Sequence, residues 1–309
     1  MRTARILILR GGAIGDFIVT LPAIQALRNR WPDSYIELIG YPHVAQLAAH
    51  AGLVNRVRSL DEARIARLFA WNVRIEEDDQ SYYSSFDFVL NYLHDPEQVL
   101  TDYLKRCGVR VVINGSPLNI ESHATEHFLR PLHSLAIFES DPTPMLELQH
   151  LAKRPEDKRL PWVAVHPGSG SRRKNWPIHN FIDLARRLDD HFGLRPVFIT
   201  GDAECESIPD LDMHLLPFSR LHNLNLIELA VELTCARLFI GNDGGITHLA
   251  ASVGCPTMAL FGPTNPAIWS PRGRVVHILS SRSQIMNDLH PEDVWAEVES
   301  FYTKGVQNR

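Results

Sequence analysis

The order of apolar runs along the chain predicts an α/β protein with two Rossmann-like domains and mostly parallel sheets. Short apolar runs alternate with longer amphipathic patterns through both halves of the 309 residues. Two of these runs, residues 6–9 and 237–240, lead into glycine-rich loops and then into helical patterns. In open parallel sheets ligands bind at the carboxyl ends of strands, where helix N–H groups face the crevice. Two such loops, each with an aspartate and each on its own half, predict an enzyme that works in a cleft between two similar domains.

The first half contains the expected elements of one parallel sheet. Its expected strands are residues 6–9, 35–39, 57–60, 86–93 and 110–113, because these runs are short, apolar and bounded by turn residues. Its expected helices, by their amphipathic period, are residues 17–30, 44–51, 63–69, 97–107 and 124–138. This βαβα order predicts a first domain over residues 1–151.

A second domain is expected after residues 152–161, a charged, proline-bounded segment without apolar period that is typical of a linker. The strands expected in this second domain, residues 162–290, are 162–165, 196–200, 238–240, 257–261 and 275–279. The helices expected with them are 178–192, 226–235 and 247–253, followed by a last helix at 291–301. That last helix starts at Pro291 and carries acidic residues in its first turn, as the helix dipole favours.

Bulk composition excludes several functional classes. The net charge of −5 does not favour nucleic-acid binding. No stretch approaches the ~18 apolar residues of a membrane span, so any membrane association is expected to be peripheral. The four cysteines have no CxxC spacing and are expected to be reduced. We therefore expect a cytoplasmic protein, and a monomer.

The first glycine loop does not fit a dinucleotide-binding turn. A G-x-G-x-x-G fingerprint that ends at Gly15 needs glycine at position 10, which is Arg10. The acidic residue expected about twenty positions further on, after the second strand, is also missing. We therefore expect no nicotinamide or flavin cofactor. Asp16, at the start of a helical pattern, remains open to two interpretations on this evidence, a helix cap or a functional carboxylate.

Four segments in the same order carry a family resemblance. They read RGGAIGDFIVTLPAIQALR at 10–28, HPGSGSRRKNWP at 166–177, GNDGGITHLAA at 241–251 and LFGPTNP at 260–266. A shorter segment, SHATEHFL at 122–129, accompanies them. Together they resemble glycosyltransferase family 9, the ADP-heptose:lipopolysaccharide heptosyltransferases and their relatives. The resemblance spans nearly the whole chain.

The resemblance implies the GT-B fold, in which two Rossmann-like domains face each other across a cleft. The first domain is then expected to hold the acceptor and the second the nucleotide-sugar donor, while the last helix, 291–309, packs back on the first domain. The implied reaction is inverting transfer of a sugar, in the first instance heptose from ADP-heptose. The implied acceptor is a lipopolysaccharide core or a related glycan or glycolipid, at the inner membrane surface.

The resemblance also implies roles for individual residues. Asp16 matches the catalytic base, and Lys174 matches the catalytic lysine that contacts the donor phosphates. Glu204 matches the residue that binds the ribose hydroxyls, although the loop around it has no firm anchor. The other expected donor-binding residues are Ser169, Gly170, Asp243, Gly244, Gly245 and His248, and the expected acceptor-binding residues are Gly12, Ala13, Arg64 and Arg130.

Some assignments stay open at this point. His248 is expected either to neutralise the leaving phosphate or to pack as a buried structural histidine. Arg172 and Arg173 are expected either to bind an anion or to be solvated. A basic patch on the first domain is expected, with most of its residues also open to being solvated helix faces; its candidates are Arg56, Arg58, Arg64, Arg67, Arg74, Lys105, Arg106 and Arg130.

No metal and no cofactor beyond the nucleotide-sugar are expected. Residues 210–212, Asp-Leu-Asp, fit an Asp-x-Asp motif formally, but they lie far in sequence from the glycine loops. His123 and His127 share one helical face, which is a spacing that zinc sites use, but a zinc site is not expected there. The alternatives to the heptosyltransferase are a sugar-nucleotide epimerase or hydrolase of the same fold, a transferase with another donor, and a non-catalytic carbohydrate-binding relative.

Overall fold

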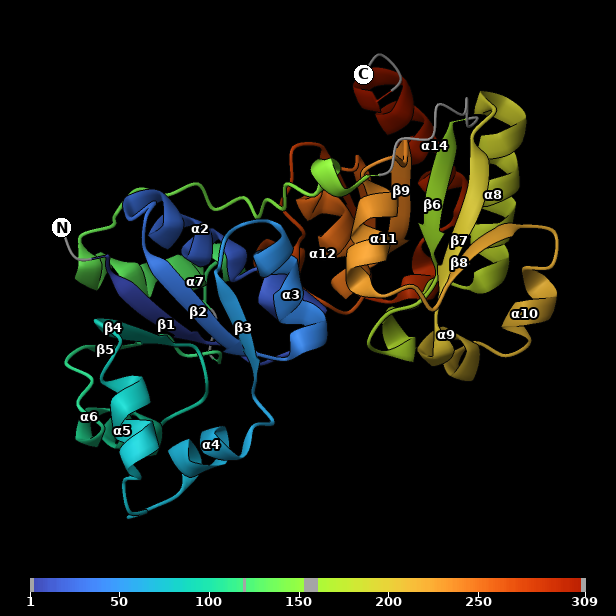
Figure 1. The fold of residues 1–309 in the computed structure, drawn as a ribbon. Helices are drawn as coiled ribbons and strands as arrows, with labels where there is room; N and C mark the ends of the chain where they lie inside the picture. The colour runs from blue at the N-terminus through green and yellow to red at the C-terminus, as the bar shows by residue number, and fades with distance from the viewer. Residues whose placement is uncertain (1–2, 119–120, 153–160, 307–309) are drawn as a thin grey trace. The chain divides into compact units, whose positions relative to one another are not determined.

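The computed structural model describes residues 3–118, 121–152 and 161–306, and it divides into two compact units, Met1–Pro142 and Thr143–Arg309 (Figure 1). Each unit contains one parallel sheet with helices between successive strands. The predicted fold class, two Rossmann-like α/β domains with parallel sheets, is therefore confirmed.

The first unit is built on a five-stranded sheet with the order β3-β2-β1-β4-β5. Its strands are β1 (Arg5–Leu9), β2 (Tyr35–Gly40), β3 (Arg56–Ser59), β4 (Phe88–Asn91) and β5 (Val112–Asn114). The central strand β1 is apolar along almost its whole length because helices cover both faces of a parallel sheet. Leu7 pairs in register with Glu37 on one side and with Val89 on the other. The carboxyl ends of these strands therefore meet at one edge of the sheet.

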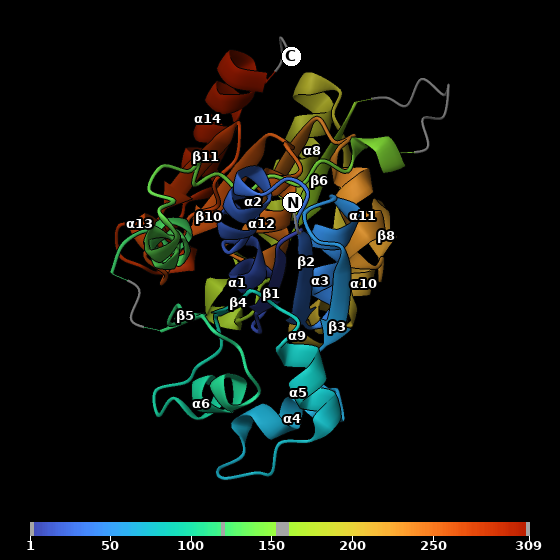
Figure 2. The same cartoon turned by 60° about the vertical axis from the view of Figure 1, so that its left-hand side comes forward.

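The helices of this unit are α1 (Ile14–Ile18), α2 (Leu21–Arg30), α3 (Pro42–His50), α4 (Ala63–Ala66), α5 (Glu77–Tyr83), α6 (Val99–Arg106) and α7 (Ala124–Leu129). The helix predicted over 17–30 is split after Ile18, because the Thr20 hydroxyl donates to the Asp16 carbonyl and Pro22 lies in the first turn of a new helix. The helix predicted over 124–138 ends at Leu129 and continues as a 3-10 helix, since Pro131 has no N–H for the α-helical ladder. Figures 1 and 2 show α4, α5 and α6 together at one end of this unit.

The second unit is built on a six-stranded sheet with the order β11-β10-β9-β6-β7-β8. Its strands are β6 (Trp162–His166), β7 (Arg195–Thr200), β8 (Ser219–His222), β9 (Leu238–Asn242), β10 (Thr257–Phe261) and β11 (Val276–Ser280). Its helices are α8 (Ile178–Phe192), α9 (Asp202–Ser207), α10 (Leu211–His214), α11 (Leu226–Leu233), α12 (Gly245–Ser252), α13 (Pro266–Trp269) and α14 (Pro291–Phe301). Strand order reverses between β6 and β9, which is where ligands bind in sheets of this kind.

Helix α14 packs within the second unit, and its expected packing on the first domain stays a prediction. Val294 and Val298, its fully buried residues, belong to the same hydrophobic core as Val163 of β6 and Phe181 of α8. Arg187 of α8 forms an ion pair with Glu292 at the start of α14. The apolar side of α14 is therefore covered by the sheet and helix of its own unit.

The division between the units precedes the predicted linker. Leu146 and Leu148 are fully buried, and the Leu146 N–H donates to the Ser252 carbonyl at 2.9 Å. These contacts place residues 143–152 with the second unit, whereas the sequence assigned most of them to the first domain. Most of the predicted linker, residues 153–160, lies outside the described residues. Within the described part of the chain, no helix is both long and apolar enough to span a bilayer.

Candidate active site

In the second unit, three loops at the carboxyl ends of adjacent strands carry the predicted donor-binding residues. Residues 167–175 follow β6, residues 201–204 follow β7, and residues 243–245 follow β9. Strand β6 lies between β9 and β7 and pairs with both. Lys174, Glu204 and Asp243 are far apart in sequence, but the sheet brings their loops to one edge.

Lys174 and Asp243 form an ion pair between two of these loops. The Lys174 Nζ lies 2.7 Å from the Asp243 Oδ2, and the two side chains are 32% and 6% exposed. An ammonium group has three N–H donors, so the bond to Asp243 leaves others for an anion. The N-terminus of α12, which begins at Gly245, adds the positive end of a helix dipole to the same place. The pair thus presents a partly exposed cation beside a helix N-terminus.

Asn242 and Trp176 anchor the loop that carries Lys174. The Asn242 Oδ1 accepts a hydrogen bond from the Trp176 N–H at 3.0 Å, and the Asn242 Nδ2 donates to the Pro167 carbonyl at 2.8 Å. The buried Trp176 indole donates to the Leu289 carbonyl at 2.9 Å. Both residues belong to motifs quoted above, but nothing in the sequence showed that they bond to each other across 66 positions.

The glycine and serine residues of these loops have different structural roles. Ser169 stabilises its own loop, because its hydroxyl lies 2.6 Å from the Asn175 Oδ1 and accepts from the Ser171 N–H at 3.2 Å. A Cβ at Gly170 would meet no atom within 4 Å, so this position borders open space. A Cβ at Gly244 would lie 3.6 Å from the Ser169 Cα, which shows that the two loops touch. Gly245 is the first residue of α12.

Glu204 is held by backbone and side-chain partners near the end of β6. Its Oε2 accepts from the Gly201 N–H at 2.8 Å, and its Oε1 lies 3.5 Å from the His166 Nε2. Burial raises the pKa of Glu204, but His166 and the Gly201 N–H outweigh burial and hold that pKa below its usual value. Glu204 is therefore an ionised acceptor at this edge. His248, the other titratable residue predicted here, is 5% exposed within α12.

In the first unit, Asp16 lies directly after the glycine loop that follows β1. Its Oδ2 accepts from the Ala13 N–H at 3.0 Å, so Asp16 caps its own helix. Gly12 has φ +95°, and a Cβ there would lie 2.8 Å from the Asp16 Cβ. Glycine is thus required both for the backbone turn and for the close approach of Asp16. One carboxylate oxygen forms the cap, and among the described residues Oδ1 has no hydrogen-bond donor. The N–H of Ala13, one of the predicted acceptor-binding residues, donates to the cap.

Arg10 is a buried cation beneath Asp16 to which the sequence assigned no role. Its Nη2 donates to the Asp16 carbonyl at 2.6 Å and its Nε donates to the Thr20 hydroxyl at 2.9 Å. Its guanidinium also lies 4.5 Å from the centre of the Phe128 ring. Burial lowers the pKa of Arg10 to about 10, while the negative charge of Asp16 acts in the opposite direction. Arg10 thereby fixes the backbone of α1 and places a positive charge near Asp16.

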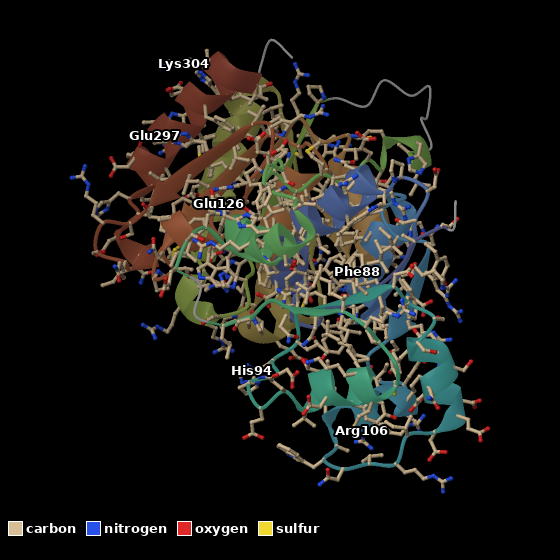
Figure 3. All side chains as sticks on the ribbon, turned by 90° about the vertical axis from the view of Figure 1, so that its left-hand side faces the viewer. Phe88, His94, Arg106, Glu126, Glu297 and Lys304 are labelled. Carbon is tan, nitrogen blue, oxygen red and sulfur yellow. The ribbon has the colours of Figure 1, made fainter. Side chains whose placement is uncertain are left out.

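Three arginines of the expected basic patch of the first unit pair with buried carboxylates. Arg64 and Arg67 both pair with the fully buried Asp79, at 3.1 Å and 2.6 Å, and Arg58 pairs with the buried Glu37 at 2.9 Å. Arg106, labelled in Figure 3, donates to the Val73 carbonyl at 2.8 Å. These guanidinium groups therefore have protein partners. In particular, Arg64 pairs with Asp79, so its position gives no support to its predicted role in acceptor binding.

Arg130 differs from Arg64, the other predicted acceptor-binding cation, because it is exposed and borders a groove. The groove has a volume of about 510 Å³ and follows the edge strand β5 and the 3-10 helix after α7. It is lined by Val111, Val112, Ile113, Asn114, Arg130, Pro131, Ser134 and Leu135. Arg130 is thus placed where an incoming group could reach it, and its acceptor role stays a prediction.

The two candidate metal motifs have protein partners of their own. His123 Nδ1 accepts from the Thr125 N–H at 3.3 Å, and His127 Nε2 lies 2.7 Å from the Ser116 carbonyl oxygen. Asp212 of the Asp-x-Asp segment pairs with Arg220. In residues 3–118, 121–152 and 161–306, no three His, Cys, Asp or Glu side chains are grouped to hold a metal. Metal-independent catalysis stays a prediction.

Comparison with known proteins gives consistent similarities. The model of glycosyltransferase family 9 (heptosyltransferase) matches residues 120–298. A putative glycosyltransferase of Haemophilus influenzae is 29% identical over 36% of this chain, which spans only about a third (34%) of that relative. Lipopolysaccharide heptosyltransferase 1 of Pseudomonas aeruginosa is 26% identical over 87% of this chain and 82% of its own length. The structure of Escherichia coli heptosyltransferase WaaC with ADP has a TM-score of 0.74 at 19% identity, covering 96% and 99% of the two chains.

Proposed function

This chain belongs to glycosyltransferase family 9, and from that premise we propose that it transfers heptose from ADP-heptose to a glycan acceptor with inversion at the anomeric carbon. The observation that carries the proposal is the Lys174–Asp243 pair beside the N-terminus of α12. A partly exposed ammonium next to a helix N-terminus suits the diphosphate of a nucleotide-sugar. The solved relative with ADP supports adenine as the base.

The proposed reaction is a single displacement. The acceptor hydroxyl attacks the anomeric carbon of the donor, and the bond from that carbon to the phosphate oxygen breaks. The hydroxyl proton passes to Asp16, and the electron pair of the broken bond leaves with ADP. Lys174 and the N–H groups at the start of α12 stabilise the charge that develops on the leaving phosphate. Asp243 holds Lys174 in position and Glu204 receives the ribose hydroxyls.

Asp16 suits the role of base because its position is fixed while one oxygen stays available. The Ala13 N–H and the closely packed Gly12 fix the carboxylate, and Arg10 fixes the backbone of α1. A base held in this way needs little reorganisation when it accepts a proton.

We propose that the acceptor is a sugar of a lipopolysaccharide core or of a related glycolipid. The heptosyltransferase of Pseudomonas aeruginosa supports this class of acceptor. The corresponding place of action is the cytoplasmic surface of the inner membrane, which cell fractionation tests directly.

Calorimetric titration with ADP, UDP, GDP and NAD, without added metal, tests the donor. Selective binding of ADP that is weakened in a Lys174→Ala variant is the expected result. Preference for UDP would keep the site but change the donor. Binding of NAD alone, with no response to the nucleoside diphosphates, contradicts the proposal.

A further inference from the structure

His166 is a buried histidine at the carboxyl end of β6 to which the proposed reaction gives no role. It is 4% exposed, and its Nε2 lies 3.5 Å from the Glu204 Oε1. Its other ring nitrogen, Nδ1, is buried without a hydrogen-bond partner among the described residues. The ring therefore interacts on one side only, and that side faces Glu204.

The unpartnered Nδ1 decides which nitrogen carries the proton of a neutral ring. A buried N–H donor without an acceptor is costly, so a proton on Nδ1 is disfavoured. A proton on Nε2 instead points to a carboxylate oxygen. His166 is therefore arranged as a donor to the Glu204 Oε1.

Glu204 is restrained from two further directions. The Gly201 N–H donates to its Oε2 at 2.8 Å. A Cβ at Gly168 would lie 2.2 Å from its Oε1, so only glycine at this position lets the carboxylate lie against the loop after β6. The end of β6, the loop after it and the start of α9 thus converge on one carboxylate. Each carboxylate oxygen can accept more than one hydrogen bond, so both oxygens can also accept from a ligand.

We propose that His166 is a positioning residue that holds the Glu204 carboxylate in the orientation needed to accept hydrogen bonds from the ribose hydroxyls of the donor nucleotide. This inference rests on the proposed function, in which Glu204 binds the ribose. His166 thereby sets the discrimination between ADP and a nucleotide that lacks the ribose hydroxyls, although it does not touch the sugar. The diphosphate contacts, made by Lys174 and the N-terminus of α12, are independent of it.

The ratio of the Kd for 2′,3′-dideoxy-ADP, which lacks both ribose hydroxyls, to the Kd for ADP measures this discrimination. Hydrogen bonds to a charged acceptor are strong enough to give wild type a ratio of about ten or more. Glu204→Gln should reduce that ratio because it removes the charge. His166→Leu should reduce it at least about threefold, and His166→Gln, whose side-chain N–H can replace the Nε2 donor, should restore most of it.

The affinity for 2′,3′-dideoxy-ADP separates positioning from a general structural role. In His166→Leu this affinity should stay within about twofold of wild type, because the phosphate contacts are intact. An unchanged ratio, or an equal loss of affinity for both nucleotides, overturns the inference. Gly168→Ala should displace the Glu204 carboxylate while His166 is intact, so it should lower the same ratio. This variant tests the inference even if the His166 variants fold poorly. Wild type that binds ADP without discrimination overturns this inference alone, whereas failure to bind ADP overturns the proposed function.

Discussion

Removal of the Lys174 ammonium should weaken ADP binding in two ways. In Lys174→Ala the cation that is expected to contact the diphosphate is lost. The variant also leaves Asp243, whose side chain is 6% exposed, without the partner that lies 2.7 Å away. An unpaired carboxylate then lies at the place where two phosphates have to bind. Both changes act against an anionic ligand and neither acts on a neutral one.

The size of the effect follows from the type of bond. A hydrogen bond to a charged group contributes about 1.5–3 kcal/mol to binding. Its loss should therefore raise the Kd for ADP about 10- to 150-fold. Calorimetric titration of wild type and Lys174→Ala with ADP measures this change. Adenosine is the matched ligand, since it has the same base and ribose without phosphate, and its Kd should not change.

A second variant separates the two contributions. Asp243→Asn in the Lys174→Ala background removes the unpaired negative charge, so it should recover part of the lost affinity. A Kd for ADP within about twofold of wild type in Lys174→Ala would show that the Lys174 ammonium does not bind the diphosphate. An equal loss of adenosine affinity would count against such binding as well, because the effect then comes from a distorted loop and not from charge.

Three further predictions concern the first unit. Asp16→Asn keeps an oxygen for the helix cap but removes the base, so kcat should fall about 10²- to 10⁴-fold with the Kd for ADP unchanged; steady-state kinetics and calorimetry check both values, and full activity removes Asp16 from the mechanism. Gly12→Ala should lower kcat because its Cβ would lie 2.8 Å from the Asp16 Cβ at φ +95°. The control is Gly52→Ala, which is strained at φ +71° but has no atom within 4 Å of the added Cβ, so it should cost about 1 kcal/mol of stability without loss of kcat. Equal losses of kcat in the two variants would contradict the steric argument. Asp79→Asn should lower the free energy of unfolding by about 1–3 kcal/mol at pH 7. Burial raises the pKa of Asp79, but hydrogen bonds from Arg67 and Tyr103 outweigh burial and lower that pKa overall. The difference in free energy of unfolding between wild type and this variant should therefore be complete above about pH 4 and shrink as the pH falls further. Urea unfolding at several pH values measures this difference, and a difference that grows towards low pH would contradict the lowered pKa.

The sequence predicted most of the sheets because parallel strands buried on both faces are short apolar runs. Helix α8 was predicted at the residues where it occurs, since its apolar period is strong and Gly193 ends it in a left-handed conformation. Strand β8 was missed because it is an exposed, polar edge strand, which has no apolar signal. Helix α5 was missed for a related reason: Asp79, one of its two buried residues, is charged, and the arginines that make its burial possible lie elsewhere in the chain.

The candidate site was predicted as residue types but not as contacts. Asp16, Lys174 and Asp243 stand out because each lies in a glycine loop at the end of a strand. The pairing of Lys174 with Asp243 depends on the adjacency of β6 and β9, which is a property of sheet order and not of spacing. The same holds for His166 and Glu204, which meet because β6 and β7 are neighbours. The sequence could not show which arginines of the first unit pair with buried carboxylates, since arginine and aspartate form both surface and buried ion pairs.

Sugar transfer with ADP as leaving group can be followed by incubating the protein with ADP-heptose and a lipopolysaccharide-core acceptor. ADP release and the NMR spectrum of the product are then measured together. We expect ADP to appear in equal amount to a heptosylated product whose anomeric configuration is inverted, and we expect omission of the acceptor to stop the release. Release of ADP at the same rate without acceptor, or a product with retained configuration, contradicts the proposed transfer.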